Sequence, residues 1–187
     1  MRFSLLAILV TFTAFTVIGC SEDDPAPSKV FMAAQLGPGS DAAVNGAAQC
    51  KLTTQPWLNL GKSEASVETG TKQSEANVEV ECKVVAAGDG YDVVARASLL
   101  PGGTVTISGK FRSSGAQQGI TASFTRADTG TPFRDKTCTV EYVNKDMGVG
   151  PGMVWGRLTC PHAEQSGGGD IRVCQGTAEF KFENCSK

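Results

Sequence analysis

Seven cysteines and a single histidine are the residues of this chain best suited to do chemistry. A thiol can form a disulfide, bind a soft metal ion, act as a nucleophile or carry an acyl group, and the spacing and cell compartment decide between these roles. One cysteine, Cys20, ends an apolar N-terminal run. The other six are spread over the rest of the chain: Cys50, Cys82, Cys138, Cys160, Cys174 and Cys185.

The wide spacing of these six cysteines predicts three disulfides. A metal site is disfavoured because the sequence contains no Cys-x-x-Cys pair and only one histidine to complete a mixed site. Six cysteines allow fifteen pairings. Isolation in the N-terminal half favours Cys50–Cys82, and a hairpin turn near Val149 would bring Cys138 beside Cys160. The remaining pair is then Cys174–Cys185, which requires a break in the intervening strand; the alternative set joins Cys160 to Cys174 and Cys138 to Cys185.

Residues 1–20 have the features of an export signal: a basic start at Arg2, an apolar run too short for a stable membrane span, and a small residue before the expected cleavage point. The tail Val17-Ile18-Gly19-Cys20 resembles the lipobox of bacterial lipoproteins. The resemblance implies cleavage before Cys20 and acylation of that residue with fatty acids such as palmitate. The alternative is an ordinary signal peptide, with Cys20 taking part in a disulfide.

The lipobox resemblance also implies a location. Ser21 directly follows Cys20, an arrangement that resembles the lipoproteins sorted to the bacterial outer membrane, whereas an Asp at that position implies retention at the inner membrane. An acidic pair, Asp23-Asp24, lies just beyond. The membrane is therefore an expected partner through the N-terminal lipid, and two or three acyl chains anchor firmly where one does not. We expect a signal peptide over 1–19, a lipidated N-terminus and flexible tether over 20–46, and a disulfide-stapled domain over 47–187. Within the tether, Val30-Phe31-Met32 is apolar enough to form a short strand on the domain.

The charge balance excludes one class of partner. With 17 Lys+Arg against 19 Asp+Glu, the formal net charge is −2. No basic stripe is available to neutralise phosphates, so we expect no binding of nucleic acid.

The dominant period after residue 47 is two, which predicts β-strands with one buried face. The clearest case is a hairpin over about 77–99, where two alternating segments flank the turn-forming Asp89-Gly90 pair. Similar short segments recur every 8–12 residues or slightly more, and none shows a helical period. We therefore expect an all-β domain, an antiparallel β-sandwich or a jelly roll.

No familiar catalytic motif stands out in this sequence. His162 follows Cys160-Pro161 at the exit of a strand, where a solvated loop residue is the simpler interpretation than a general base. Asp128-Thr129-Gly130 resembles the aspartic-protease triplet but occurs once, and those enzymes need two such carboxylates; a turn explains it better. Asp89 and Asp92 could supply part of a calcium site, although an Asp-Gly turn accounts for them as well.

The candidate binding patch is Trp155 with Met153 and Arg157. If Val154 and Leu158 face the core, these three side chains point outward from the same strand. The competing interpretation is that Trp155 fills the core and Gly156 marks a close approach.

Two functions follow as expectations. The first is a membrane-anchored envelope lipoprotein, non-catalytic and without a cofactor, that is structural or binds a glycan or protein ligand. The second is a secreted hydrolase with carboxylates such as Asp89, Asp92, Asp128 or Asp135 in a cleft. Two carboxylates about 5–10 Å apart in a concave site would favour the hydrolase.

Overall fold

The computed structural model describes residues 25–39, 50–52, 56–167 and 170–187, and these form an all-β fold. These residues contain twelve strands and no helix long and apolar enough to cross a membrane. The strands are β1 (Lys29–Gly37), β2 (Pro56–Leu60), β3 (Val67–Glu68), β4 (Lys72–Gln73), β5 (Ala76–Ala87), β6 (Gly90–Leu100), β7 (Gly103–Arg112), β8 (Gln117–Arg126), β9 (Phe133–Glu141), β10 (Gly148–Gly150), β11 (Met153–Gly167) and β12 (Asp170–Glu183).

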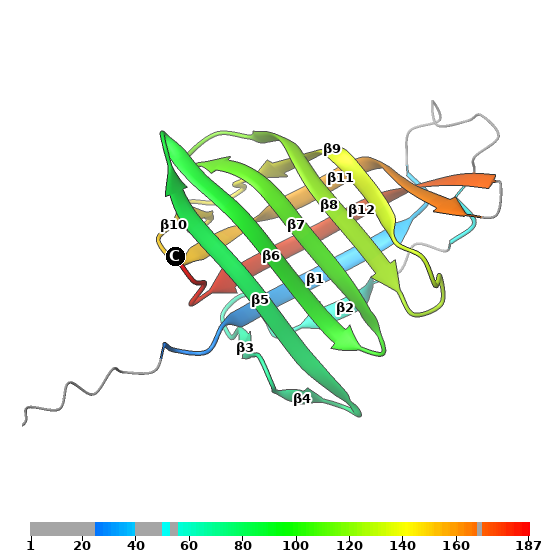
Figure 1. Cartoon of the computed structure of the whole chain (residues 1–187), viewed down its shortest axis with the longest axis horizontal. Coiled ribbons are helices and arrows are strands. Elements are labelled where there is room, and N and C mark those ends of the chain that lie inside the picture. The colour runs from blue at the N-terminus through cyan, green and yellow to red at the C-terminus, as the bar shows by residue number, and fades with distance from the viewer. Residues whose placement is uncertain (1–24, 40–49, 53–55, 168–169) are drawn as a thin grey trace, which may run out of the picture.

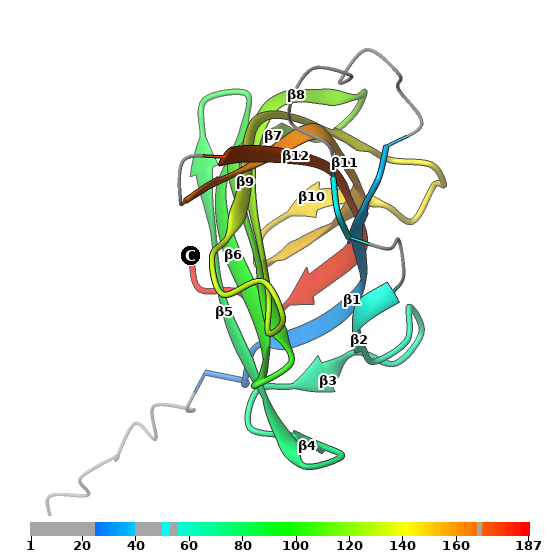
Figure 2. The ribbon, with the colours of Figure 1, turned by 90° about the vertical axis from the view of Figure 1, so that its right-hand side faces the viewer.

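All strands belong to one antiparallel sheet in the order β2-β1-β12-β11-β9-β8-β7-β6-β5-β4, with β10 on β11 and β3 on β1. In Figure 1 strands β5 to β8 run across β1, β11 and β12, which lie behind them, and the view in Figure 2 shows that the sheet curls, so that β5 to β9 lie opposite β1, β2 and β12. The expected antiparallel all-β class is therefore confirmed. The single curled sheet is compatible with the sandwich arrangement, since its two halves enclose one core.

Alternation of apolar and polar residues along each strand builds this core. Val30, Met32, Ala34 and Leu36 of β1 are fully buried, and the residues between them are not. Phe124 of β8 contacts Trp57 of β2 across the core, with ring centroids 6.0 Å apart. The largest fully buried side chains are Phe111, Phe124, Phe133, Phe180, Phe182, Met32, Leu36, Leu58, Leu60, Ile107, Ile120 and Leu158.

The expected hairpin over 77–99 is present as β5 and β6. These strands pair from Asn77↔Leu100 to Ala87↔Gly90, and the turn between them contains Gly88 with a φ of 62°. Positive φ at this glycine fits the short connection that the Asp89-Gly90 sequence predicted.

The expected tether over 20–46 is wrong for its described part. Residues 29–37 form β1, which lies inside the sheet between β2 and β12 and pairs with β12 from Lys29↔Glu183 to Gly37↔Gln175. The strand suggested by Val30-Phe31-Met32 is therefore longer than expected and central to the fold. The domain begins near residue 29 rather than at 47; residues 1–24 and 40–46 lie outside the described residues.

The three disulfides are Cys50–Cys174, Cys82–Cys185 and Cys138–Cys160. The last is the pair that the hairpin argument predicted, since the neighbouring residues Thr139 and Thr159 pair directly between β9 and β11.

The expected pairs Cys50–Cys82 and Cys174–Cys185 are wrong. β12 continues without a break from Asp170 to Glu183, so Cys174 and Cys185 lie too far apart along the strand to meet. Curling of the sheet instead brings Cys82 of β5 beside the segment that follows β12, where Lys83 and Ser186 form a parallel bridge. Cys185 therefore takes Cys82 as its partner, and Cys174 takes Cys50.

Gly176 provides a test of the tight contact between the two halves of the sheet. It lies on β12, and a Cβ atom added there would overlap the ring of Phe124 on β8. We expect Gly176→Ala to lower the free energy of unfolding by about 2 kcal/mol, because the Phe124 ring must move within a packed core. Urea denaturation measures this, with Gly148→Ala as the control, since a Cβ there meets nothing within 4 Å. Equal stability of the two variants would contradict the overlap.

Candidate functional site

The site lies where two neighbouring strands, β9 and β11, both bulge. The two strands pair at Thr139↔Thr159 and again at Arg134↔Glu164, with no pairing between these points. β9 shifts register against β8 between Ile120 and Ala122, and β11 shifts against β12 between Cys160 and Ala163. A bulge leaves backbone N–H groups without a partner in the ladder. Two bulges side by side therefore need an acceptor.

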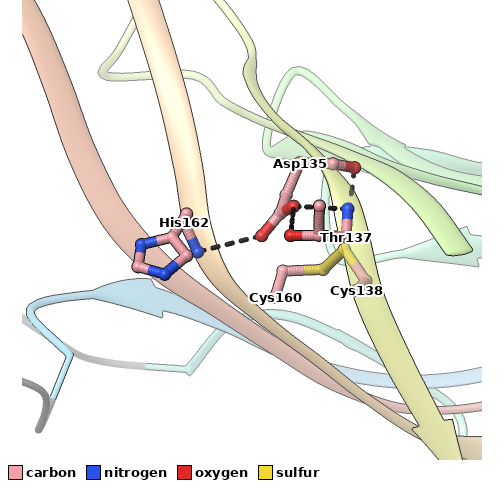
Figure 3. The surroundings of a disulfide bond; sticks show 5 residues. All are labelled: Asp135, Thr137, Cys138, Cys160 and His162. Atoms are coloured by element: carbon pink, nitrogen blue, oxygen red, sulfur yellow. Dashed lines mark hydrogen bonds between the residues drawn. A yellow bond between two sulfur atoms is a disulfide. The ribbon is translucent and has the colours of Figure 1, made fainter. Parts of the chain in front are cut away.

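Asp135 supplies that acceptor. Its side chain is directed into the gap, and the residue is only 4% exposed. Oδ1 accepts hydrogen bonds from the backbone N–H and the hydroxyl of Thr137, both at 2.7 Å, and Oδ2 accepts one from the backbone N–H of His162 at 2.9 Å (Figure 3). One carboxylate thus joins the bulge of β9 to the bulge of β11. Hydrogen bonds to an ionised acceptor are the stronger kind, and this set compensates for burial of the charge.

The Cys138–Cys160 disulfide crosses the same gap (Figure 3). The two sulfur atoms and a carboxylate oxygen of Asp135 lie within 4.8 Å of one another, a spacing that suits metal ligands. The sulfur atoms are bonded to each other, however, so neither is a thiolate, and the carboxylate already accepts three hydrogen bonds. This cluster is therefore a structural clasp rather than a metal centre.

A pocket of about 750 Å³ opens beside this clasp. His162 is exposed at the edge of the pocket. Figure 3 shows its imidazole ring directed away from the Asp135 carboxylate, so the ring takes no part in the hydrogen bond that the His162 backbone donates to Asp135. Cationic, anionic and hydroxyl groups all face the pocket, which suits a polar ligand held by hydrogen bonds. The lining residues are Thr131, Pro132, Arg134, Asp135, Lys136, Thr137, His162 and Glu164.

One wall of the pocket is the turn between β8 and β9. Gln165 of β11, which is buried, fastens it: its side-chain nitrogen lies 3.2 Å from the Thr129 carbonyl oxygen, 3.1 Å from the Thr131 carbonyl oxygen and 2.6 Å from the Thr131 hydroxyl. Because Gln165 is itself held in the ladder, it fixes the position of Thr131 at the pocket rim.

The Asp128-Thr129-Gly130 triplet forms this turn, as the simpler interpretation predicted. Both the backbone nitrogen and the hydroxyl of Thr129 donate to the Arg126 carbonyl oxygen, at 3.1 Å and 3.0 Å. Asp128 accepts two hydrogen bonds from the Arg126 guanidinium, at 2.9 Å and 2.8 Å. Arg126 is buried, lies over the Trp57 ring and contacts the Leu36 carbonyl oxygen. Asp128 therefore neutralises a buried cation.

Asp128 also predicts a pH dependence. Its hydrogen bonds with Arg126 hold the pKa of Asp128 below its usual range. A folded-state pKa below the unfolded one stabilises the protein at pH values above the unfolded pKa of about 4, and this stability is lost as the pH falls through the lower folded pKa. We expect Asp128→Asn to cost about 1 kcal/mol at pH 6, less than a fully buried pair because Asp128 is exposed, and to cost less near pH 2. Urea denaturation at the two pH values measures the difference; a cost that is equally large at the lower pH would contradict it.

The other two aspartates lie elsewhere. Asp89, in the turn between β5 and β6, forms ion pairs with Lys110 at 3.2 Å and Arg112 at 3.3 Å. The hydrogen bond with Lys110 is the main cause that lowers the pKa of Asp89. Asp92 is exposed on β6. Of the four aspartates considered for a hydrolase, only Asp135 lines the pocket, and the acidic residue beside it is Glu164.

The candidate binding patch of Trp155, Met153 and Arg157 lies on the outer face of β11. Val154 and Leu158 are fully buried, so the interpretation in which Trp155 fills the core is wrong, although Gly156 does mark a close approach, to the Val140 side chain.

The groups of this patch already have partners within the chain. The Lys181 ammonium lies 5.2 Å from the centroid of the Trp155 ring, and Arg157 forms an ion pair with Glu179 at 3.3 Å. A sugar ring that stacked on this indole face would have to displace Lys181. The pocket beside Asp135 is therefore the better candidate for a ligand.

The pocket was missed by sequence reasoning, yet two signals were available. Asp135 follows the buried Phe133 at a spacing of two, which places a carboxylate on the core face of an alternating strand. Pro161 lies inside β11, and a proline inside a strand marks a bulge or an edge.

Comparison with known proteins adds no relative: no protein-family model, curated protein or solved structure matches this chain.

Proposed function

We propose that this chain is a lipid-anchored protein of the bacterial cell envelope, attached through Cys20, and that its β domain is non-catalytic and binds a polar ligand. The observation that carries the proposal is the cysteine count. Three disulfides use six of the seven cysteines, and the seventh is Cys20 in the lipobox-like tail. Three disulfides fit an exported protein, because such bonds persist in oxidising compartments.

The states of the aspartates support a non-catalytic role. A general acid or base must reach a substrate proton. Asp135 has its oxygens occupied by backbone and hydroxyl donors, Asp128 is bound to Arg126, and Asp89 is paired with two cations. Each of these carboxylates has a structural task that accounts for its position.

The pocket supports the ligand class. Arg134, Lys136 and the His162 ring offer donors, Glu164 offers an acceptor, and Thr131 offers both. Mixed donors and acceptors of both charges suit a neutral, hydroxyl-rich ligand such as an envelope glycan better than a strongly charged one. A polar segment of a partner protein is the other class that such a pocket fits.

The experiment that tests the anchor is mass spectrometry of the mature N-terminus after expression in a bacterium that processes lipoproteins. We expect a chain that begins at Cys20 and carries acyl groups on its sulfur and its amine. Cys20→Ser should carry none, and Ser21→Asp should move the acylated protein from the outer to the inner membrane fraction. An unmodified N-terminus with release of the protein into the medium would overturn the proposal.

One observation favours a second function, the hydrolase. Asp135 and Glu164 line the same pocket as His162, so two carboxyl groups and an imidazole share one concave site. The test is a panel of chromogenic esters and glycosides with the wild-type protein and with Glu164→Gln. Turnover that Glu164→Gln abolishes would favour the hydrolase, and absence of turnover on the panel favours the binding protein.

A further inference from the structure

Pro27 and Ser28, which directly precede β1, are hydrogen-bonded to the domain. The side-chain nitrogen of Asn184 donates to the Pro27 carbonyl oxygen at 3.0 Å, and the Ser28 hydroxyl donates to the Asn184 carbonyl oxygen at 3.3 Å. The backbone nitrogen of Thr69 donates to the Ser28 carbonyl oxygen at 3.0 Å, and β1 begins at the next residue. The chain is therefore held against the folded domain at Pro27 and Ser28.

The segment around Asn184, to which Pro27 and Ser28 are bonded, is itself held by a disulfide and by backbone hydrogen bonds. Cys185 is bonded to Cys82 of β5, and its backbone nitrogen donates to the Gly152 carbonyl oxygen at 2.9 Å. The backbone nitrogen of Ser186 donates to the Cys82 carbonyl oxygen at 3.0 Å. Residues 25–28, 151–153 and 183–187 thus form one end of the molecule, which we call the entry end; it lies to the left in Figure 1.

The covalent distance from Cys20 to Pro27 is short. Seven residues reach at most about 25 Å when fully extended, and about 15 Å on average as a flexible coil. The domain is longer than that, because the 15 residues of β11 alone extend about 45–50 Å. A tether shorter than the domain prevents the domain from inverting on the membrane, because the residues near Pro27 would then lie farther from the surface than the tether can reach.

The entry end also has the composition of a surface that rests on polar headgroups. Its exposed residues are Pro25, Ala26, Pro27, Pro151, Asn184, Ser186 and Lys187, and they surround a hollow of about 680 Å³. No large apolar side chain among the exposed residues of this end is available to insert into hydrocarbon.

We propose that the entry end is the membrane-facing surface of the domain, in contact with the phospholipid headgroup layer that holds the Cys20 lipid, and that the opposite end points away from it. This inference rests on the proposed acylation of Cys20. Its consequence is that the pocket beside Asp135 lies away from the bilayer: His162 is nine residues along β11 from Met153, or about 30 Å at the rise of a strand.

Energy transfer to the membrane tests this orientation with the full-length acylated protein in phosphatidylcholine vesicles that carry a small fraction of acceptor-labelled lipid. A donor is attached through an azide-bearing amino acid at position 187, in the entry end, or at position 127, in the turn after β8. The turn lies beside Gln165, twelve residues along β11 from Met153, and so about 40 Å from the entry end. We expect energy transfer from position 187 to exceed transfer from position 127 about two-fold or more, because the donor at position 127 lies about 40 Å farther from the labelled lipids and dipolar transfer falls steeply with distance.

A matched control lengthens the tether. Insertion of about 20 Gly and Ser residues after residue 24 raises the average reach of the tether to roughly 30 Å and should remove most of the difference between the two donors. Equal transfer from positions 187 and 127 in the acylated protein without the insertion would overturn the orientation alone. Mass spectrometry of the same samples separates the two proposals, since a sample without acyl chains overturns the anchor and the orientation together.

Discussion

Replacing Asp135 with alanine should lower the free energy of unfolding by about 3–5 kcal/mol, the largest effect that we expect from any single side chain outside the disulfides. The change removes three hydrogen bonds to an ionised acceptor, each of the kind that contributes about 1.5–3 kcal/mol. It also leaves the backbone N–H groups of Thr137 and His162 without a partner where the ladder between β9 and β11 is interrupted. Part of the cost is recovered if water enters from the adjacent pocket.

Urea denaturation of the oxidised protein measures this effect through the midpoint, with the slope unchanged. Asp92→Ala is the matched control, because Asp92 is an exposed aspartate on β6 and its loss should change stability by less than about 0.5 kcal/mol. Asp135→Asn should fall between the two, since one of the two carboxylate oxygens becomes a donor. If Asp135→Ala were as stable as Asp92→Ala, the carboxylate would not hold the two bulges together, and a catalytic or binding role would become the better explanation of its burial.

Local features of the fold were predictable from the sequence because they depend on near neighbours. Alternation identifies β5, β6 and the last strand, where Ala178, Phe180 and Phe182 are buried as their spacing predicts. The Asp89-Gly90 pair predicts the hairpin for the same reason, since turn geometry depends on a few adjacent residues.

Long-range features were not predictable in this way. β1 was assigned largely to a tether because its flanks are rich in proline and glycine, yet both of its edges find partners, β12 on one side and β2 on the other. Only tertiary pairing supplies the hydrogen bonds that make this segment a strand, which is the general reason why strand propensity depends on context.

The candidate site also depends on long-range features that the sequence does not reveal. The sequence left open whether Trp155 points outward or fills the core; Val154 and Leu158 are fully buried, and Trp155, on the opposite face of β11, is only partly buried. The sequence could not show that Lys181 would cover the indole ring, because this contact depends on the register between β11 and β12. The pocket beside Asp135 depends on two bulges on different strands meeting side by side, and no pattern within one strand encodes that meeting.

The disulfide between Cys82 and Cys185 carries the second large effect. Replacing both residues with alanine should lower the free energy of unfolding by about 5 kcal/mol, because a cross-link over a sequence separation of 103 residues removes much of the entropy of the unfolded chain. The matched control is the double alanine variant at Cys138 and Cys160, whose separation of 22 residues gives about 3 kcal/mol in the same treatment. Urea denaturation of both variants provides the comparison.

Loss of Cys82–Cys185 should also act on the folded state, and this distinguishes its role from entropy alone. The bond joins β5 to the segment after β12 and so fixes Asn184, which holds Pro27 at the entry end. Hydrogen exchange should therefore speed up at the amide groups of Val84 and Ser186, which donate across this closure, and at that of residue 185, which donates to the Gly152 carbonyl oxygen, while amides of the β8–β9 pairing stay protected. A variant with reduced stability but unchanged exchange at these three amides would mean that the bond acts only on the unfolded chain. In that case the hydrogen bonds and the parallel bridge at Lys83 would be enough to close the curled sheet by themselves.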